Sequence, residues 1–192
     1  MGKKIETLEN FKIAIISTVK SIIGEQNIEV TFGSEINKKN NKTINLPSLK
    51  NIKNINDFIK ARALADSEAL KFKCSDLNIY NSFEPQGSMS KLLYAIAEKI
   101  RYENIGSSYF KGIKENLNYL YEAKNKAKIE YKNEDYEFLD AFECYLRSSI
   151  SESNKIKDSE NKYKKYKKKL DSKLKEKVEL LNKSLLDQKK FN

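Results

Sequence analysis

Residues 57–72, with the sequence DFIKARALADSEALKF, contain the clearest helical pattern in the chain. One face of the predicted helix is formed by residues at spacings of three and four: Phe58, Ala61, Ala65, Ala69 and Phe72. Asn56 directly precedes this segment and has a side chain suited to cap a helix N-terminus. We therefore expect a helix from about residue 57, and the neighbouring segments decide whether the rest of the chain is helical as well.

Three apolar stripes follow downstream at the same helical spacing. They are formed by Met89, Leu93, Ile96 and Ile100, then Tyr109, Ile113, Leu117 and Leu120, and then Phe138, Phe142, Tyr145 and Leu146. Residues 81–87, which contain Pro85 and Gly87, predict a loop before the first stripe, and Gly106 predicts a break after it. Asn133 is a predicted N-cap for the third helix.

Upstream of residue 57, the pattern changes from helix to strand. Residues 5–23 carry an apolar helical face, and Gly24 is a natural stop. Residues 28–34 and 43–46 alternate between apolar and polar side chains, as short strands do. The simplest interpretation is a β-hairpin over about residues 28–47, which must lie against helices because two strands alone are only marginally stable.

The C-terminal part of the chain is distinctly basic. Residues 155–177 contain eleven lysines against four acidic residues, a net charge of +7 out of +10 for the whole chain. An apolar stripe continues through it: Tyr163, Tyr166, Leu170, Leu174, Val178, Leu181 and Leu185. This pattern predicts a long amphipathic helix with a basic face, which either projects from the domain or pairs with another helix.

Together these segments predict a mainly α fold: a helical bundle of five to six helices with one small β-hairpin and a long basic C-terminal helix. We expect a helical domain over residues 1–150 and a basic helical extension over residues 151–192. The length of 192 residues is typical of one domain with an extension. Charged residues make up 33% of the chain and hydrophobic residues 39%, so a core can form in a chain of mean hydropathy -0.70.

Missing residue types exclude several kinds of active site. The chain has no histidine, so it contains neither an imidazole base nor a histidine-ligated metal. Its two cysteines, Cys74 and Cys144, cannot form a four-thiolate zinc site. Two buried thiols in a reducing cytoplasm are favoured over a long disulfide. The six glycines form no phosphate-binding loop, and we predict no catalytic, cofactor-binding or metal residues in this chain.

We expect a cytoplasmic protein, since the longest apolar run, residues 92–97, is far shorter than a membrane span. The basic start of the chain is not followed by the apolar region of a signal peptide.

Two groups of acidic residues lie on the predicted helices. Asp66 and Glu68, or Glu98 and Glu103, could be considered as acid/base pairs, but spacings of two and five do not bring helical side chains together. Arg62 with Asp66, and Glu98 with Arg101, have the spacings of ion pairs. We predict that these groups form a structural or interaction network: Arg62, Asp66, Glu98, Arg101 and Glu103.

Short stretches in the first two thirds of the chain occur in an order that resembles one known family. They are VTFGSE at 30–35, LP at 46–47, RALADSEAL at 62–70, PQG at 85–87, AEKIRYENIG at 97–106, KG at 111–112 and NL at 116–117. This succession, over roughly residues 5–120, is similar to the N-terminal domain of the CobT subunit of aerobic cobaltochelatase. The family's von Willebrand A domain has no counterpart here, which predicts either a naturally short member, as from a compact or viral genome, or a fragment.

The resemblance implies a role in cobalamin biosynthesis. Members of the family work with an AAA+ ATPase subunit and a large chelatase subunit, which together insert cobalt into a corrin ring at the expense of ATP. We therefore expect a non-catalytic subunit or adaptor that bridges the ATPase and its client within an oligomeric assembly. ATP, magnesium and cobalt are expected at the partner subunits.

Two alternatives remain open at the level of sequence. The chain could be a helical binding module whose basic tail contacts nucleic acid, or an AAA+ adaptor unrelated to tetrapyrroles. These alternatives differ in how the tail binds: its apolar stripe could dock on protein, or its lysines could contact the phosphates of nucleic acid. We favour docking on protein through the apolar stripe, whose predicted docking residues are Leu170, Leu174, Val178, Leu181 and Leu185.

Overall fold

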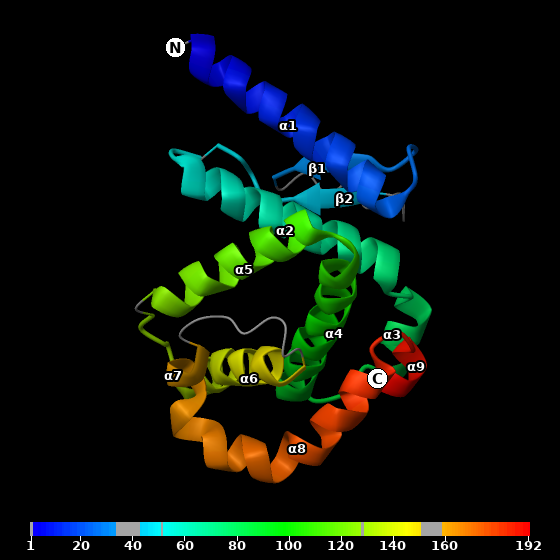
Figure 1. The fold of residues 1–192 in the computed structure, drawn as a ribbon, viewed down its shortest axis with the longest axis vertical. Helices are drawn as coiled ribbons and strands as arrows, with labels where there is room; N and C mark the ends of the chain where they lie inside the picture. Colours follow the sequence, from blue (N-terminus) through cyan, green and yellow to red (C-terminus); the bar gives the residue numbers. More distant parts are fainter. Residues whose placement is uncertain (1, 34–42, 51, 128, 151–158) are drawn as a thin grey trace. The chain divides into compact units, whose positions relative to one another are not determined.

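The computed structural model describes residues 2–33, 43–50, 52–127, 129–150 and 159–192, with side chains from residue 7 onward. It confirms the mainly α class and contains seven helices of at least seven residues within the described ranges, more than the five to six predicted. The chain forms two compact units, Met1–Cys74 and Ser75–Asn192 (Figure 1). This division differs from the expected one at residues 150 and 151, because the tail packs into the second unit.

The first unit contains α1 (Gly2–Ile23), β1 (Glu29–Phe32), β2 (Thr43–Leu46) and α2 (Ile55–Cys74). The two helices pack on each other, and the Phe11 and Phe58 rings meet edge to face with their centroids 4.6 Å apart. The sheet contacts α2 through β2. The core of this unit consists of Ile15, Val19, Ile22, Ile28, Ile44, Leu46, Leu49, Ala63, Ala65, Ala69 and Leu70.

The predicted hairpin is wrong, although both strands are present. β1 and β2 pair in parallel, with Glu29 opposite Thr43 and Phe32 opposite Leu46. A parallel pair requires the chain to return to the starting end of the first strand. Residues 33–42 are long enough for that, since a strand of four residues spans only about 13 Å. The alternation of side chains is the same in either direction, so it could not distinguish the two pairings.

The start of α2 is capped by a different asparagine from the one predicted. Asn54, not Asn56, precedes the helix, and its Oδ1 accepts a hydrogen bond of 3.1 Å from the Asp57 amide. In return, Asp57 Oδ2 accepts from the amides of Lys53 at 2.9 Å and Asn54 at 3.3 Å. This reciprocal pairing satisfies amide groups that lack partners within a first helical turn.

The second unit is helical in its described residues. It contains α3 (Leu77–Phe83), α4 (Ser88–Tyr109), α5 (Lys111–Lys126) and α6 (Glu134–Ile150), followed by the helices of the tail. The predicted loop at 81–87 is shorter than expected, because Asp76 caps α3 and the helix continues to Phe83. The predicted break at Gly106 is also wrong: Gly106 is buried within α4, and the chain turns at Phe110. The Asn133 cap is confirmed, with Oδ1 accepting from the Tyr136 amide at 3.1 Å.

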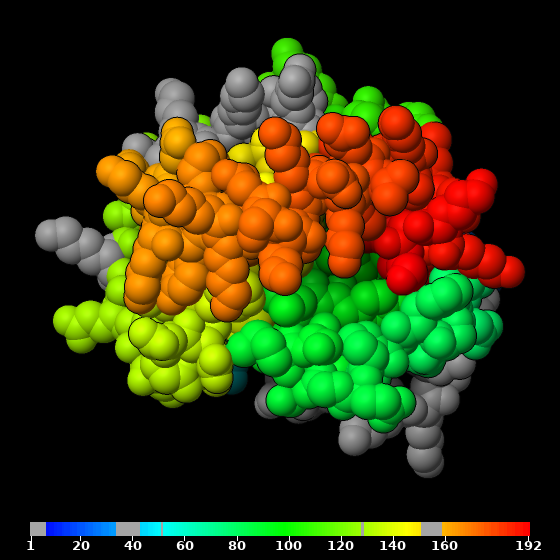
Figure 2. All heavy atoms as spheres, turned by 90° about the horizontal axis from the view of Figure 1, so that it is seen from below, coloured from blue at the N-terminus to red at the C-terminus, as the bar shows by residue number. Residues whose placement is uncertain are grey.

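The tail is helical but not one continuous helix. Within residues 159–192 it forms α7 (Ser159–Tyr163), a 3-10 turn (Lys164–Tyr166), α8 (Lys167–Ser184) and α9 (Gln188–Phe191). α7 and α8 pack against α6, as Figure 2 shows for the orange residues that cover this face of the second unit. The part of the predicted extension at 151–158 lies outside the described residues.

Candidate functional site

A buried ion pair lies on α4, as the spacing of three predicts. Arg101 Nε donates to Glu98 Oε2 and Arg101 Nη2 donates to Glu98 Oε1, both at 2.8 Å. The side chains are only 2% and 3% exposed. Such a two-pronged pair is stronger than a single hydrogen bond because both carboxylate oxygens are satisfied in one fixed geometry.

This ion pair holds three other parts of the second unit. Ser75 Oγ donates to Glu98 Oε1 at 2.7 Å, and Arg101 Nη1 donates to the Leu185 carbonyl at 3.2 Å. The Arg101 guanidinium carbon also lies 6.0 Å from the centroid of the Phe191 ring. The pair was expected to tie two central helices together. Instead it joins α4 to the segment before α3 and to the C-terminal end of the tail.

A second contact between the same segments lies beside it. The Asp76 amide donates to Gln188 Oε1 at 2.7 Å, while Gln188 Nε2 donates to the Asp76 carbonyl at 3.2 Å. The Gln188 side chain therefore satisfies both backbone groups of Asp76, as a neighbouring strand would. We call the five residues Ser75, Asp76, Glu98, Arg101 and Gln188 the tail clamp.

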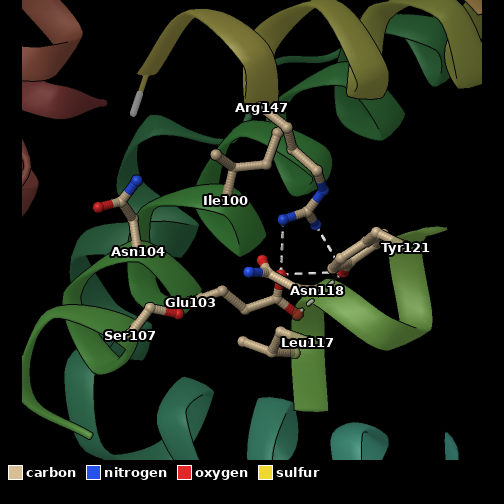
Figure 3. A pocket seen from close by; sticks show the side chains of 8 residues that line it. All are labelled: Ile100, Glu103, Asn104, Ser107, Leu117, Asn118, Tyr121 and Arg147. Atoms are coloured by element: carbon tan, nitrogen blue, oxygen red, sulfur yellow. Dashed lines mark hydrogen bonds and ion pairs between the residues drawn. The ribbon is translucent and has the colours of Figure 1, made fainter. Parts of the chain in front are cut away.

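Glu103 takes part in a further group of buried polar side chains, drawn in Figure 3. Its Oε2 lies 2.8 Å from Arg147 Nη1 on α6 and accepts from the Tyr121 hydroxyl on α5 at 2.9 Å. Arg147 Nη2 donates to the same hydroxyl at 2.6 Å, and the guanidinium carbon lies 3.6 Å from the centroid of the Tyr121 ring. Three helices therefore meet at one triangle of side chains.

The network continues along α6 away from Glu103. Arg147 Nη2 donates to Glu143 Oε1 at 2.9 Å, and Lys124 Nζ on α5 donates to Glu143 Oε2 at 2.6 Å. Lys124 Nζ also lies 2.8 Å from Asp140 Oδ1, and the Tyr131 hydroxyl donates to Asp140 Oδ2 at 2.6 Å. We call Glu103, Tyr121, Lys124, Asp140, Glu143 and Arg147 the helix-bracing network.

The surroundings of this network shift the pKa values of three of its groups away from their ordinary values. Burial raises the pKa of Glu143, but Arg147 and Lys124 lower it by more, to about 2. Burial and the Glu103 carboxylate raise the pKa of Tyr121 well above its usual value. Burial lowers the pKa of Lys124, yet Glu143 and Asp140 outweigh that effect and the pKa is raised. The carboxylate and the ammonium therefore stay charged, and the phenol stays protonated, at neutral pH.

Among the described residues, a small cavity and a larger cleft adjoin the helix-bracing network. The smaller has a volume of about 30 Å³, enough for one or two water molecules, and is lined by the residues drawn in Figure 3: Ile100, Glu103, Asn104, Ser107, Leu117, Asn118, Tyr121 and Arg147. The larger is an open cleft of about 430 Å³ beside residues 129–132 and α6, with apolar walls that include Ile96, Tyr136 and Leu139. Two of the carboxylates that line it, Asp140 and Glu143, already pair with Lys124.

The remaining predicted pair lies in the first unit. Arg62 Nε donates to Asp66 Oδ1 at 2.8 Å, with the Asp66 side chain fully buried and that of Arg62 31% exposed. The predicted polar residues therefore pair as follows: Arg62 with Asp66 in the first unit, and Glu98 with Arg101 and Glu103 with Arg147 in the second.

The apolar stripe of the tail lies against the chain itself. Leu170 and Val178 are buried, and Leu174, Leu181 and Leu185 pack against the core cluster that contains Ile100, Phe142 and Leu146. Cys144 belongs to this core, and burial raises the pKa of its thiol to about 12. Cys144 is buried as predicted, whereas Cys74 is half-buried, and neither takes part in a disulfide among the described residues.

Sequence reasoning missed most of the helix-bracing network. Tyr121, Lys124, Asp140, Glu143 and Arg147 were not singled out, although Glu143 and Arg147 have the spacing of four that favours an ion pair on a helix.

The described part of the chain contains no group of three or more acidic or cysteine side chains arranged to hold a metal ion. No helix within it is long and apolar enough to cross a membrane.

Comparison with known proteins identifies the family. No solved structure matches the chain significantly. A family model described as cobalamin biosynthesis protein CobT matches residues 6–192, which include both units and the tail. The match therefore extends beyond the stretches that resemble the family in sequence, which end near residue 120. The chain belongs to the CobT family of cobalamin biosynthesis proteins.

Proposed function

We propose that this chain is a non-catalytic subunit of an ATP-dependent cobaltochelatase-like complex, in which it links an AAA+ ATPase subunit to the subunit that holds the corrin ring. Membership of the CobT family supports partners of the cobaltochelatase type. In this proposal ATP and magnesium bind to the ATPase subunit, and cobalt is the substrate that the large chelatase subunit places in the corrin.

The observation that carries the proposal is that buried carboxylates of the second unit are paired with arginines. Glu98 is held by Arg101, and Glu103 and Glu143 are held by Arg147. Removing one partner from a buried ion pair costs about 3–5 kcal/mol, so these carboxylates cannot exchange a partner for a metal or a proton during a reaction without destabilising the fold. These ion pairs therefore stabilise a rigid arrangement of helices.

A rigid body is what a linking subunit requires. Movement generated by ATP hydrolysis reaches a client only through elements that do not yield on the way. The helix-bracing network joins α4, α5 and α6, and the tail clamp joins α4 to both ends of the second unit. In this proposal the second unit moves as one piece when a partner pushes on any of its helices.

Reconstitution with the partner subunits tests the proposal. The chain is mixed with the AAA+ ATPase and large chelatase subunits of the same source, and cobalt entry into the corrin is followed by its absorbance while ATP hydrolysis is measured. We expect insertion only when all three components are present, and no heat of binding when the chain alone is titrated with ATP or with cobalt(II). Insertion by the two partner subunits without this chain would contradict the proposal, as would stoichiometric binding of either ligand by the chain.

The same assay separates the proposal from an AAA+ adaptor unrelated to tetrapyrroles. Such an adaptor would alter ATP hydrolysis by the ATPase subunit equally with and without the corrin. A cobaltochelatase subunit should instead change the hydrolysis rate more when corrin and large subunit are both present, and this dependence is the expected result.

A further inference from the structure

The outward side of α8 carries a row of lysines that ends in a leucine. Lys169, Lys173, Lys177 and Leu180 follow one another at spacings of four, four and three, so they lie along one side of the helix. All four are exposed, and Leu180 is 64% exposed. We call these four residues the basic row.

The opposite side of the helix fixes the direction of the basic row. Leu170 is 2% exposed and Val178 is 6% exposed, and both belong to the core of the second unit. Turning α8 about its axis would bring these apolar side chains into water, which is unfavourable. The lysines therefore face solvent as a fixed surface, and Figure 2 shows the orange residues of α8 lying uncovered across this face.

The charge around the basic row is strongly positive. Residues 159–177 contain nine lysines against three acidic residues. Lys162 forms an ion pair with Asp140, and Lys165 forms one with Glu137. Within the described ranges, no carboxylate lies within ion-pair distance of Lys173 or Lys177, while Lys169 Nζ lies 5.1 Å from the centroid of the Phe138 ring. This surface attracts a partner of opposite charge.

Two observations favour an acidic protein segment over nucleic acid. The tyrosines beside the row face inward, with Tyr163 against Tyr145 and Tyr166 against Phe138, so they offer no ring on which a base could stack. The helix also exposes Leu180 at the end of the row, which offers an apolar contact that suits a protein side chain and not a phosphate backbone. We propose that the basic row binds an acidic segment of a partner protein that carries apolar side chains among its acidic residues.

The proposal is tested on the full chain alone, so its outcome is independent of the cobaltochelatase assay. The probe is a fluorescent peptide with a repeating Glu-Glu-Leu sequence, and its anisotropy is measured across a salt series. The charge-reversed variant K169E/K173E/K177E should bind at least about tenfold more weakly, and Leu180→Ser should weaken binding by roughly threefold. Because all four positions are exposed, circular dichroism should show unchanged helix content.

A matched control makes the same change of net charge at lysines outside the tail. The variant K53E/K71E/K126E changes three exposed lysines outside the tail and should bind the peptide within about twofold of the original chain. Equal weakening by both triple variants would overturn the proposal, because net charge alone would then explain binding. Tighter binding of a DNA duplex than of the peptide, lost in K169E/K173E/K177E, would also overturn it in favour of nucleic acid.

Discussion

Arg147 Nη1 on α6 lies 2.8 Å from Glu103 Oε2 on α4, with the two side chains 10% and 2% exposed. The same guanidinium neutralises Glu143 and covers the Tyr121 ring. Replacing it therefore leaves two nearly buried carboxylates without their main cation, which is far costlier than losing a surface contact.

The first prediction concerns this residue. Arg147→Leu should lower the free energy of unfolding by about 3–5 kcal/mol, measured by urea denaturation. The control is Lys165→Ala, which removes a 2.7 Å ion pair to Glu137 whose lysine is 56% exposed and should cost at most about 1 kcal/mol. Equal losses in the two variants would show that the helix-bracing network does not depend on Arg147.

The second prediction concerns the tail clamp. Arg101→Ala removes the cation of Glu98 and the donor to the Leu185 carbonyl, so it should both destabilise the chain by about 3–5 kcal/mol and loosen the end of the tail. Limited proteolysis should cut the variant faster near residues 184–191, as well as lowering its melting temperature. Lys91→Ala, at an exposed pair with Glu84, is the control and should change neither. An unchanged melting temperature in Arg101→Ala would contradict the structural role of the pair.

The third prediction follows from the low pKa of Glu143. Its pKa is about 2 in the folded chain against an ordinary value of 4.5, so the folded state favours the ionised form. The resulting stability is fully present above pH 4.5 and is lost as the pH falls through about 2. Between these values the original chain should lose on the order of 3 kcal/mol through this group alone.

Glu143→Gln provides the comparison for that loss. The variant should be less stable at neutral pH, and the difference between the two proteins should shrink as the pH falls from 4.5 toward 2. Urea unfolding at a series of pH values measures it. A difference that stays constant over this range would show that Glu143 does not have a lowered pKa.

The fourth prediction compares two leucines on α8. Leu170 is 2% exposed and Leu180 is 64% exposed, although both lie on the same helix. Leu170→Ala should cost about 2–5 kcal/mol because it leaves a cavity in the core cluster, whereas Leu180→Ala should stay within about 0.5 kcal/mol. Thermal denaturation checks both, and a loss of stability in Leu180→Ala larger than that in Leu170→Ala would mean that α8 is rotated relative to the structure described.

Helical periodicity predicted most of the architecture, since it reports which residues share a face within one segment. α1 covers Gly2–Ile23 against the predicted residues 5–23, and α6 begins directly after the predicted Asn133 cap. The stripe from Leu170 to Leu185 was also predicted, and the structure shows that it packs within the same chain. What periodicity cannot report is direction between segments, so the parallel pairing of Glu29–Phe32 with Thr43–Leu46 was missed.

The polar sites show the same division between local and distant information. Arg62 with Asp66, and Glu98 with Arg101, could be paired from sequence because three or four residues separate the partners. Glu103 and Arg147 lie on different helices, and no spacing rule connects them. Tyr121 has no feature in the sequence that distinguishes it from other tyrosines on helices. Its hydroxyl joins the helix-bracing network only because the fold places it beside Arg147.

The pairing of Asp76 with Gln188 joins residues 112 positions apart, and it bears on the order of events during synthesis. A ribosome releases a chain from its N-terminus, so residues 1–74 can adopt their own compact arrangement while later ones are still being made. The second unit cannot complete its contacts as early, because the partner of Asp76, Gln188, is synthesised near the end of the chain. Until then the apolar surfaces that the tail covers on α6 stay open to other molecules, and this interval is when a nascent chain of this protein is most exposed to aggregation.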